Sequence, residues 1–142
     1  MNSRSWKWAL ISAPMALSVS ACMGWGGYPQ AKNVHDSELI GTWRARDCDT
    51  TLTLRPDRSA SAAGIPTETD LNGKITRRLS GDGTWAIYTS GAEQELDVTI
   101  GDEETPFDLY RDKGRLSVGL TVGDPDEMNW CTLTRHSKTP PP

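Results

Sequence analysis

Short segments in which apolar and polar residues alternate recur along most of this chain, about ten residues apart. In residues 95–100 the side chains of Leu96, Val98 and Ile100 fall on one face, and acidic or hydroxyl side chains fall on the other. The segments are separated by turns rich in glycine and proline, which number 13 and 9 in the 142 residues. This combination disfavours a helical bundle and predicts antiparallel strands joined by tight turns.

The same pattern predicts an all-β fold with an antiparallel meander of seven or eight strands. We expect the meander to form a small barrel or a sandwich, because strands at this spacing bury one face against each other. The expected strands are residues 40–45, 50–55, 59–63, 84–88, 95–100, 107–110, 115–122 and 128–135. Residues 59–63 are small and make the strand whose existence is least certain.

Residues 64–82 do not fit the strand pattern, because they contain few strand-forming side chains. Leu71, Ile75 and Leu79 stand four residues apart, as they would on one face of a helix, whereas Gly73 would weaken that helix. We therefore predict a lid-like loop with one helical turn in this stretch.

The N-terminus has the features of an export signal. Two positive charges, Arg4 and Lys7, precede an apolar stretch over residues 8–19 that is shorter than the ~20 residues needed to span a bilayer. The stretch ends in the sequence Val19-Ser20-Ala21-Cys22. An ordinary secretory signal, with Cys22 as a bystander, is the alternative to the interpretation that follows.

The sequence around Cys22 resembles the lipobox of bacterial lipoproteins. The resemblance implies a signal peptide at residues 1–21, cleavage before Cys22 and a diacylglycerol on the Cys22 thiol, so that membrane lipid is the first partner. The chain would then be anchored at the extracytoplasmic face of the cell membrane, or at the outer membrane if the source is Gram-negative.

Cleavage would leave three parts: a lipidated tether at residues 22–37, a domain at residues 38–136 and a flexible tail at residues 137–142. The tether contains Trp25 and Tyr28, which could enter the headgroup region or act as plain linker residues. Loss of the two N-terminal positive charges would change the net charge from −4 to about −6. We expect a domain of that charge to be held away from anionic lipids.

Two cysteines remain once Cys22 is set aside. In an oxidising compartment, Cys48 and Cys131 are expected to form a disulfide, with free thiols or a zinc site as alternatives. The Cys-x-x-Cys spacing typical of zinc sites is absent from the sequence. Since Cys48 follows the first expected strand and Cys131 lies in the last, a disulfide would place the two ends of the fold side by side.

The tripeptide Gly-Thr-Trp occurs twice, ending at Trp43 and at Trp85. The first copy resembles the Gly-x-Trp on the first strand of lipocalin-like barrels. That resemblance implies that Trp43 closes one end of a barrel beneath an arginine from the last strand, and Arg135 would supply the arginine through a cation–π contact. The asparagine expected before the glycine is missing here, and both tryptophans could be core residues of another small β-fold.

The apolar side chains of the expected strands would either line a cavity or fill the barrel interior. They are Trp43, Trp85, Ile87, Leu96, Val98, Phe107, Leu116, Val118 and Trp130. With the lipobox, the Gly-Thr-Trp strand and the turn at residues 123–126, the chain also resembles uncharacterised small lipoproteins of high-GC Gram-positive bacteria. That resemblance carries no assigned activity.

Signs of catalysis or metal binding are weak in the sequence. His35 falls in the expected tether and His136 near the tail, and no serine lies in a Gly-x-Ser-x-Gly motif. The acidic turns at residues 102–104 and 124–127 do not match a calcium-binding loop. We therefore predict no enzyme, cofactor or metal site, and the acidic charge argues against nucleic acid as a partner.

The sequence thus favours a monomeric, non-enzymatic binding module for a small apolar ligand or an envelope protein. The alternative is an inhibitor or immunity-type protein that acts on an envelope hydrolase through exposed loops, residues 64–82 among them. Small disulfide-bonded lipoprotein barrels that inhibit lysozyme have a similar size and anchor. A small envelope hydrolase is a third and weaker hypothesis.

Overall fold

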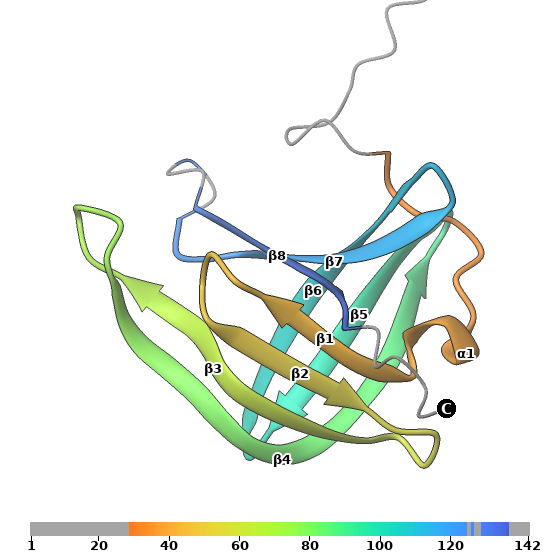
Figure 1. Ribbon diagram of the computed structural model, residues 1–142, viewed down its shortest axis with the longest axis horizontal. Helices are drawn as coiled ribbons and strands as arrows, with labels where there is room; N and C mark the ends of the chain where they lie inside the picture. Colours follow the sequence, from red (N-terminus) through yellow and green to blue (C-terminus); the bar gives the residue numbers. More distant parts are fainter. Residues whose placement is uncertain (1–28, 125, 127–128, 137–142) are drawn as a thin grey trace, which may run out of the picture.

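The computed structural model describes residues 29–124, 126 and 129–136, and in it eight antiparallel strands form a closed barrel (Figure 1). The strands follow one another in chain order, and the last pairs with the first. The predicted all-β class and meander are confirmed, and the architecture is a barrel rather than a sandwich.

A short helix, α1 (Asp36–Leu39), precedes the barrel. The strands are β1 (Gly41–Ala45), β2 (Thr50–Leu54), β3 (Ser59–Thr69), β4 (Ile75–Ser90), β5 (Glu93–Ile100), β6 (Glu103–Asp112), β7 (Arg115–Thr121) and β8 (Trp130–Arg135). Among the described residues, no helix has the length and apolar character required to cross a bilayer.

The barrel interior is filled with side chains. Leu96 lies opposite Phe107 in the strand ladders, and Val118 lies opposite Leu133. All four side chains are fully buried. The largest side chains with almost no exposed surface are Trp43, Phe107, Leu39, Leu52, Leu54, Ile65, Leu96, Leu109 and Leu133. An eight-stranded barrel is just narrow enough for such side chains to fill it.

Residues 64–82 form a two-stranded antiparallel ribbon, so the predicted loop with a helical turn is wrong. In this ribbon, which we call the β3–β4 ribbon, Ile65 pairs with Leu79 and Thr69 with Ile75 across several β-bulges. The four-residue spacing of the apolar side chains misled the prediction, because residues four apart share a face in a strand as well as in a helix. The bulges break the alternation that would have shown a strand.

The segment from residue 29 to α1 packs against the barrel, although we predicted it as part of the tether. The Ala31 N–H donates to Leu109 O at 2.8 Å, and the Arg111 N–H donates to Pro29 O at 3.0 Å. Ala31 and Val34 are both buried. The domain therefore begins earlier than residue 38. The predicted signal peptide at residues 1–21, Cys22 and the predicted tail at residues 137–142 lie outside the described residues.

Cys48 and Cys131 lie within bonding distance of each other, with their Cα atoms 5.8 Å apart, which confirms the predicted disulfide pair. The pair lies beside the seam where β8 returns to β1. That seam consists of two residue pairs, Trp43 with Arg135 and Arg44 with Thr134. The disulfide therefore joins the β1–β2 turn to the last strand, next to the place where the pairing of β1 and β8 is short.

Candidate functional site

The two ends of the barrel differ in what covers them. We call the end with α1 and the turns at residues 55–58, 90–93 and 112–115 the closed end. The other end, which carries the β3–β4 ribbon and the β7–β8 connection, we call the open end (Figure 1).

Trp43 fills the closed end. Its Nε1 donates to Leu39 O at 2.8 Å, and the guanidinium carbon of Arg135 lies 4.9 Å from the centre of its ring. Arg135 also donates to Ile40 O at 2.7 Å and to Glu38 O. The guanidinium is thus held by backbone carbonyls above the tryptophan, which gives Arg135 a role in closing the barrel end.

Trp85, from the second Gly-Thr-Trp, has the same kind of surroundings. Its Nε1 donates to Arg55 O at 2.9 Å, and the Arg58 guanidinium carbon lies 4.7 Å from its ring centre. Trp85 is buried, so its indole N–H needs the carbonyl partner that it has. Both copies of the tripeptide therefore contribute a buried tryptophan covered by an arginine.

The structure places most of the remaining predicted interior residues inside. Six of the nine are buried: Trp43, Trp85, Leu96, Val98, Phe107 and Val118. Ile87 and Leu116 are partly buried against the core.

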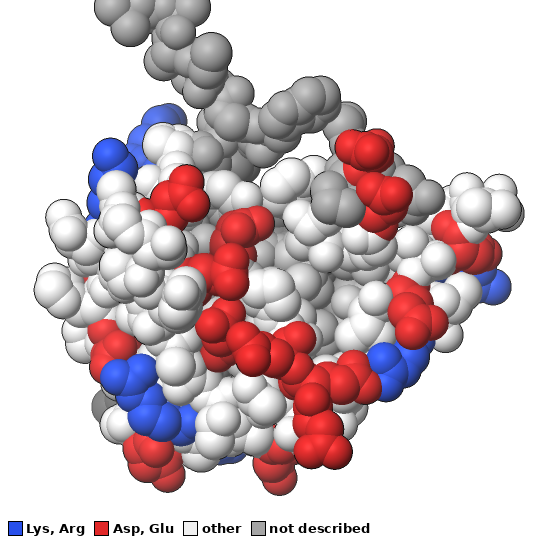
Figure 2. Space-filling model, turned by 180° about the vertical axis from the view of Figure 1, so that it is seen from behind, with Lys and Arg blue, Asp and Glu red and all other residues white. Residues whose placement is uncertain are grey.

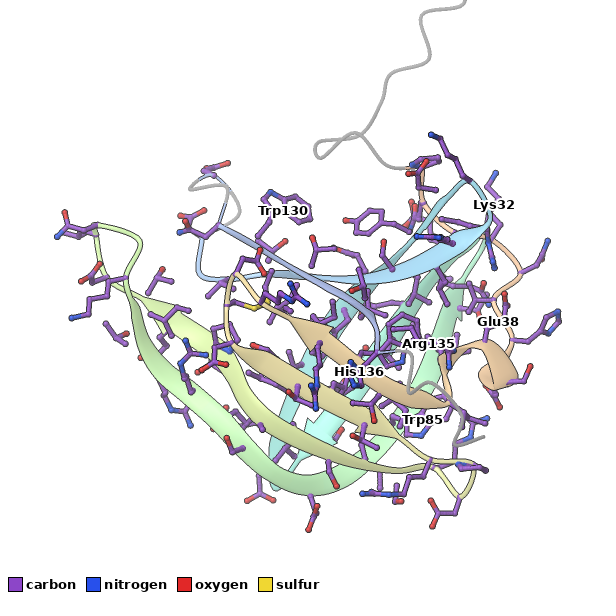
Figure 3. All side chains as sticks on the ribbon, viewed as in Figure 1. Lys32, Glu38, Trp85, Trp130, Arg135 and His136 are labelled. Atoms are coloured by element: carbon purple, nitrogen blue, oxygen red, sulfur yellow. A yellow bond between two sulfur atoms is a disulfide. The ribbon has the colours of Figure 1, made fainter. Side chains whose placement is uncertain are left out.

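Trp130 is the exception, and its predicted place in the interior is wrong. Its side chain is 36 % exposed on the outer side of β8, where it meets Tyr110 edge to face at 6.3 Å between ring centres (Figure 3). The next residue, Cys131, points inward to reach Cys48. Since successive strand residues face opposite sides, residue 130 has to point outward.

A cleft of about 730 Å³ lies at the closed end, where β7 and β8 separate. Their pairing stops at Val118 and Leu133, so the first residues of β7 leave the end of β8. Five charged side chains lie in its lining, which consists of Glu38, Trp43, Arg111, Asp112, Gly114, Arg115, Leu116, Ser117, Thr132, Thr134 and Arg135.

Two of these charged side chains neutralise each other. Arg111 Nη1 donates to Glu38 Oε1 at 2.9 Å, and the His35 N–H donates to the other Glu38 oxygen. These hydrogen bonds, that of Arg111 first, hold the pKa of Glu38 below its usual value. The pair links α1 to the end of β6 and so helps to fix the helix on the barrel.

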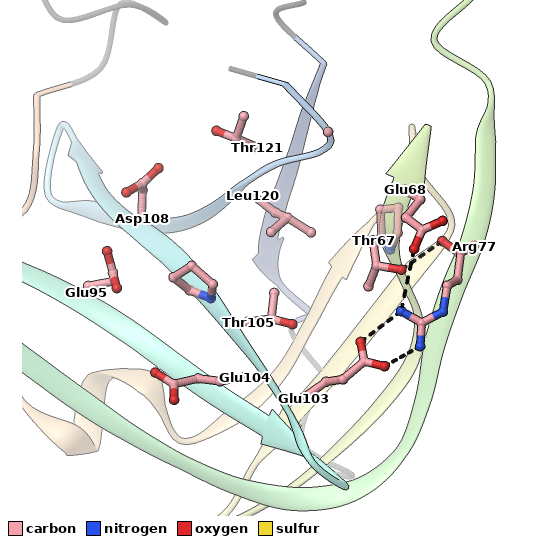
Figure 4. A pocket seen from close by; sticks show the side chains of 13 residues that line it. Thr67, Glu68, Arg77, Glu95, Glu103, Glu104, Thr105, Asp108, Leu120 and Thr121 are labelled. Atoms are coloured by element: carbon pink, nitrogen blue, oxygen red, sulfur yellow. Dashed lines mark hydrogen bonds and ion pairs between the residues drawn. The ribbon is translucent and has the colours of Figure 1, made fainter. Parts of the chain in front are cut away.

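The open end carries a groove of about 440 Å³ between the β3–β4 ribbon and strands β6 and β7 (Figure 4). The ribbon contributes Pro66, Thr67, Glu68 and Arg77 to its lining, and the barrel contributes Glu95, Glu103, Glu104, Thr105, Pro106, Asp108, Leu120, Thr121 and Gly123. Arg77 donates to both oxygens of Glu103 and lies 4.0 Å from Glu68. This ion pair fastens the ribbon to β6 across the groove and lowers the pKa of Glu103.

The wall of the groove formed by β5 and β6 is acidic. Glu95 lies opposite Asp108 in the strand ladder, and Asp97 and Glu104 lie nearby on the same outer face. Figure 2 shows acidic side chains running across one face of the molecule in a continuous band. Within the described part of the chain, none of these four carboxylates makes an ion pair with a lysine or arginine.

Burial, with a smaller contribution from neighbouring carboxylates, raises the pKa of two of these groups. Burial, followed by the neighbouring Asp97, raises the pKa of Glu95, and burial raises that of Asp108. The Tyr110 hydroxyl donates to Asp108 at 3.3 Å, and burial together with Asp108 raises the pKa of Tyr110 to about 12. A cationic group bound at this surface would therefore meet carboxylates that no described lysine or arginine neutralises.

The tip of the ribbon carries the most exposed large apolar side chain among the described residues. Leu71 is 97 % exposed, and the turn beneath it is ordered by Asp70, whose Oδ1 accepts from the N–H groups of Asn72 and Lys74 at 2.9 Å each. The four-residue spacing of Leu71, Ile75 and Leu79 predicts a helix face and gives no sign that Leu71 is exposed. The acidic wall was also missed, although the alternating carboxylates of residues 95 and 97 were visible.

Potential metal ligands among the described residues come together at Asp47, Cys48 and Cys131. Because the two sulfurs are joined to each other, they offer no thiolate to an ion. His35 and His136 contribute backbone contacts at the closed end: the His35 N–H binds Glu38, and the His136 N–H donates to Thr42 O at 2.8 Å.

Comparison of the chain with protein-family models, curated proteins and solved structures gives no match. Function is therefore argued from the geometry of the barrel and its two ends.

Proposed function

We propose that this protein is a lipid-anchored, extracytoplasmic, non-enzymatic binding module that engages a partner protein through the β3–β4 ribbon. The observation that carries the proposal is the fully exposed Leu71 at the tip of an ordered, projecting ribbon. An apolar side chain at the tip of a projection can act as an anchor that fills a pocket of the partner. Burying a leucine contributes about 1.5–3 kcal/mol.

The ribbon projects because its neighbours stop early. β2 pairs with β3 only as far as Ala63, and β5 pairs with β4 only as far as Gly83. Beyond these residues the two strands have only each other in the sheet. Arg78 supports the base of the ribbon by donating to Cys48 O at 2.7 Å and to Gly64 O at 2.8 Å. The tip is therefore held out on a stiffened arm, which limits the entropy lost when a partner binds.

The groove beside the ribbon indicates the charge of the partner. Its acidic wall, formed by Glu95, Glu104 and Asp108, lies on the side of β6 away from the ribbon residue Thr67, and both line the groove (Figure 4). A partner with lysine or arginine side chains around an apolar pocket would complement both features. Such complementarity increases the rate of association and the selectivity for the partner.

The packed interior bears on the other part of the hypothesis, a small apolar ligand. Side chains such as Phe107 and Leu52 occupy the space that a ligand inside the barrel would need. The cleft at the closed end has the volume of a ligand pocket, but five of its eleven lining residues are charged, which is unfavourable for a purely apolar ligand. These observations favour a protein partner over an apolar ligand.

The second candidate function is inhibition of an envelope hydrolase, with the ribbon tip as the inhibitory element. The observation that favours it is the narrowness of the ribbon, a single pair of strands that ends in the short turn at residues 70–74. A projection of this shape fits an enzyme cleft better than a flat surface. The two candidates differ in outcome, because an inhibitor reduces hydrolase activity in an envelope extract and a plain binding module does not.

The anchor is supported by the sequence Val19-Ser20-Ala21-Cys22 and by the position of Pro29. The first described residue already bonds to β6, so a lipid on Cys22 would be joined to the barrel by a seven-residue step. Metabolic labelling with a radioactive fatty acid, compared between the protein and its Cys22→Ser variant, tests this part alone.

The partner is tested by photocrosslinking in living cells of the source. A photoreactive amino acid is placed at residue 71 and, as a control, at residue 132, which is exposed on the outer face of β8. We expect a discrete crosslinked product from residue 71 that is absent from residue 132 and lost in a Glu95→Lys/Asp108→Lys background. Identical products from both positions, or none from residue 71, would contradict the proposal.

Deletion of the whole ribbon is not a suitable test, since Ile65 at its base is fully buried in the core. Leu71→Ser changes the tip alone, and Ala92→Ser is the control because Ala92 is exposed in the β4–β5 turn at the closed end, far from the tip. We expect the first variant to weaken partner binding and the second to leave it unchanged.

A further inference from the structure

Positive charge is concentrated at the closed end of this otherwise acidic barrel. The lysines and arginines at that end are Lys32, Arg55, Arg58, Arg111, Lys113, Arg115 and Arg135. The carboxylates there are fewer and comprise Asp36, Glu38, Asp57, Glu93 and Asp112. Elsewhere among the described residues, carboxylates far outnumber Arg44, Arg46, Lys74, Arg77 and Arg78. The barrel is therefore electrically polarised along its axis.

Several of the closed-end cations are already engaged. Arg58 pairs with Asp36, Arg111 pairs with Glu38 at 2.9 Å, and Arg135 is held by backbone carbonyls. Lys113 and Arg115, by contrast, are exposed in the β6–β7 hairpin and make no ion pair with any described residue.

Lys32 is also exposed and lacks an ion pair with the described residues, and it lies on the segment that runs along β6 (Figure 3). We call Lys32, Arg111, Lys113 and Arg115 the basic edge. In Figure 2 one group of basic side chains lies at the upper left, apart from the acidic band, and others lie at the lower left and the right beside acidic side chains.

The basic edge lies where the chain from the anchor enters the barrel. Pro29 O accepts a hydrogen bond from the Arg111 N–H at 3.0 Å, and Gln30 pairs with Tyr110. Seven residues separate Cys22 from Pro29, and a fully extended chain of that length reaches about 25 Å. A lipid on Cys22 therefore keeps the basic edge close to the membrane, whatever the conformation of the intervening residues.

We infer that the basic edge docks on anionic phospholipid headgroups and turns the open end of the barrel, with the β3–β4 ribbon, away from the membrane. The inference rests on the lipid anchor of the proposed function. The net charge of the mature chain suggested repulsion from such a surface, but screening confines electrostatic forces to about 8 Å at physiological ionic strength. The charges nearest the headgroups then decide the outcome, and there Lys32, Lys113 and Arg115, which pair with no described carboxylate, outnumber the exposed carboxylate of Asp112.

The test uses the lipidated protein reconstituted in vesicles of phosphatidylcholine alone or of phosphatidylcholine mixed with phosphatidylglycerol. A water-soluble acylating reagent labels exposed lysines, and mass spectrometry gives the rate at Lys113 and at Lys74, which is exposed at the opposite end on the ribbon. We expect phosphatidylglycerol to slow labelling of Lys113 about five-fold. This factor corresponds to the binding free energy that one basic side chain contributes at an anionic surface. Labelling of Lys74 should not change, and high salt should restore the rate at Lys113.

A pair of charge reversals makes the test specific. Arg115→Glu should remove most of the protection of Lys113, whereas Arg46→Glu, an equal change of charge at the exposed β1–β2 turn, should leave it intact. Equal rates at Lys113 in the two kinds of vesicle, or protection that survives Arg115→Glu and high salt, would refute the docking surface and leave the anchor standing. A chain that does not stay on phosphatidylcholine vesicles would refute the anchor, and the docking surface with it.

Discussion

Removal of the Cys48–Cys131 disulfide is the perturbation whose magnitude follows most directly from the structure. The bond joins residues 83 apart in sequence, and closing a loop of that length costs the unfolded chain about 4.5 kcal/mol in conformational entropy. We therefore expect Cys48→Ala/Cys131→Ala to lose about 4 kcal/mol of unfolding free energy. That is a large share of the ~5–15 kcal/mol typical of a domain.

Removal of the disulfide should also weaken the pairing of β1 with β8 locally. The two strands share two residue pairs, whereas β1 and β2 share five, so the disulfide supports the shortest ladder of the barrel. Without it, the His136 N–H, which donates to Thr42 O at 2.8 Å, should open more often. Hydrogen exchange at His136 should then accelerate more than exchange within the β4–β5 ladder.

The assay is urea unfolding followed by circular dichroism, with the oxidised protein, the reduced protein and the double variant compared at one pH. Reduction should reproduce most of the effect of the double variant, because both remove the same covalent loop. An unfolding free energy of the double variant within about 1 kcal/mol of the oxidised protein would refute the argument from loop entropy. Uniform acceleration of exchange across the barrel would refute the local role at the seam.

Three further changes test other contacts. Gly83→Ala should cost more than about 2 kcal/mol of unfolding free energy in urea, because a Cβ at this position would meet the Thr99 backbone oxygen on β5. Glu38→Gln should reduce the unfolding free energy at neutral pH. The difference from the wild type should vanish as the pH falls through the lowered pKa of Glu38, because the protonated carboxyl no longer stabilises the folded state relative to the unfolded one. Asp108→Asn should instead raise the melting temperature at pH 7, because burial raises the pKa of Asp108 and so disfavours its charged form; this gain should shrink as the pH falls and the wild-type carboxyl takes up a proton.

How far the fold could be predicted depended on how regular each strand is. Strand β5 was predicted closely, because Leu96, Val98 and Ile100 alternate without interruption and face the core. The β3–β4 ribbon was missed because one side of it faces solvent and bulges shift its register, so apolar side chains no longer fall on every second residue. The alternation of apolar and polar residues arises because one face of a strand is buried, so a strand that extends beyond the core does not show it.

The candidate site was less predictable for a related reason. Local alternation places Glu95 and Asp108 on the outside of their strands, but their meeting face to face depends on the β5–β6 register. The exposure of Leu71 depends likewise on how far the ribbon outruns β2 and β5. The aromatic character of Trp130 suggests burial, but its side chain points outward. The predicted disulfide requires the next residue, Cys131, to point inward, and successive strand residues face opposite sides.

The two Gly-Thr-Trp copies show how one motif can meet two different steric demands. At Gly41, φ is 136°, and an added Cβ would lie 2.8 Å from the Arg135 guanidinium that covers Trp43. At Gly83 the obstacle is instead the backbone of the neighbouring strand β5. A flexible arginine can move aside, whereas a paired strand cannot. Gly41→Ala should therefore cost chiefly through its strained φ and a weakened contact over Trp43, and it should be better tolerated than Gly83→Ala, although Thr-Trp follows both glycines.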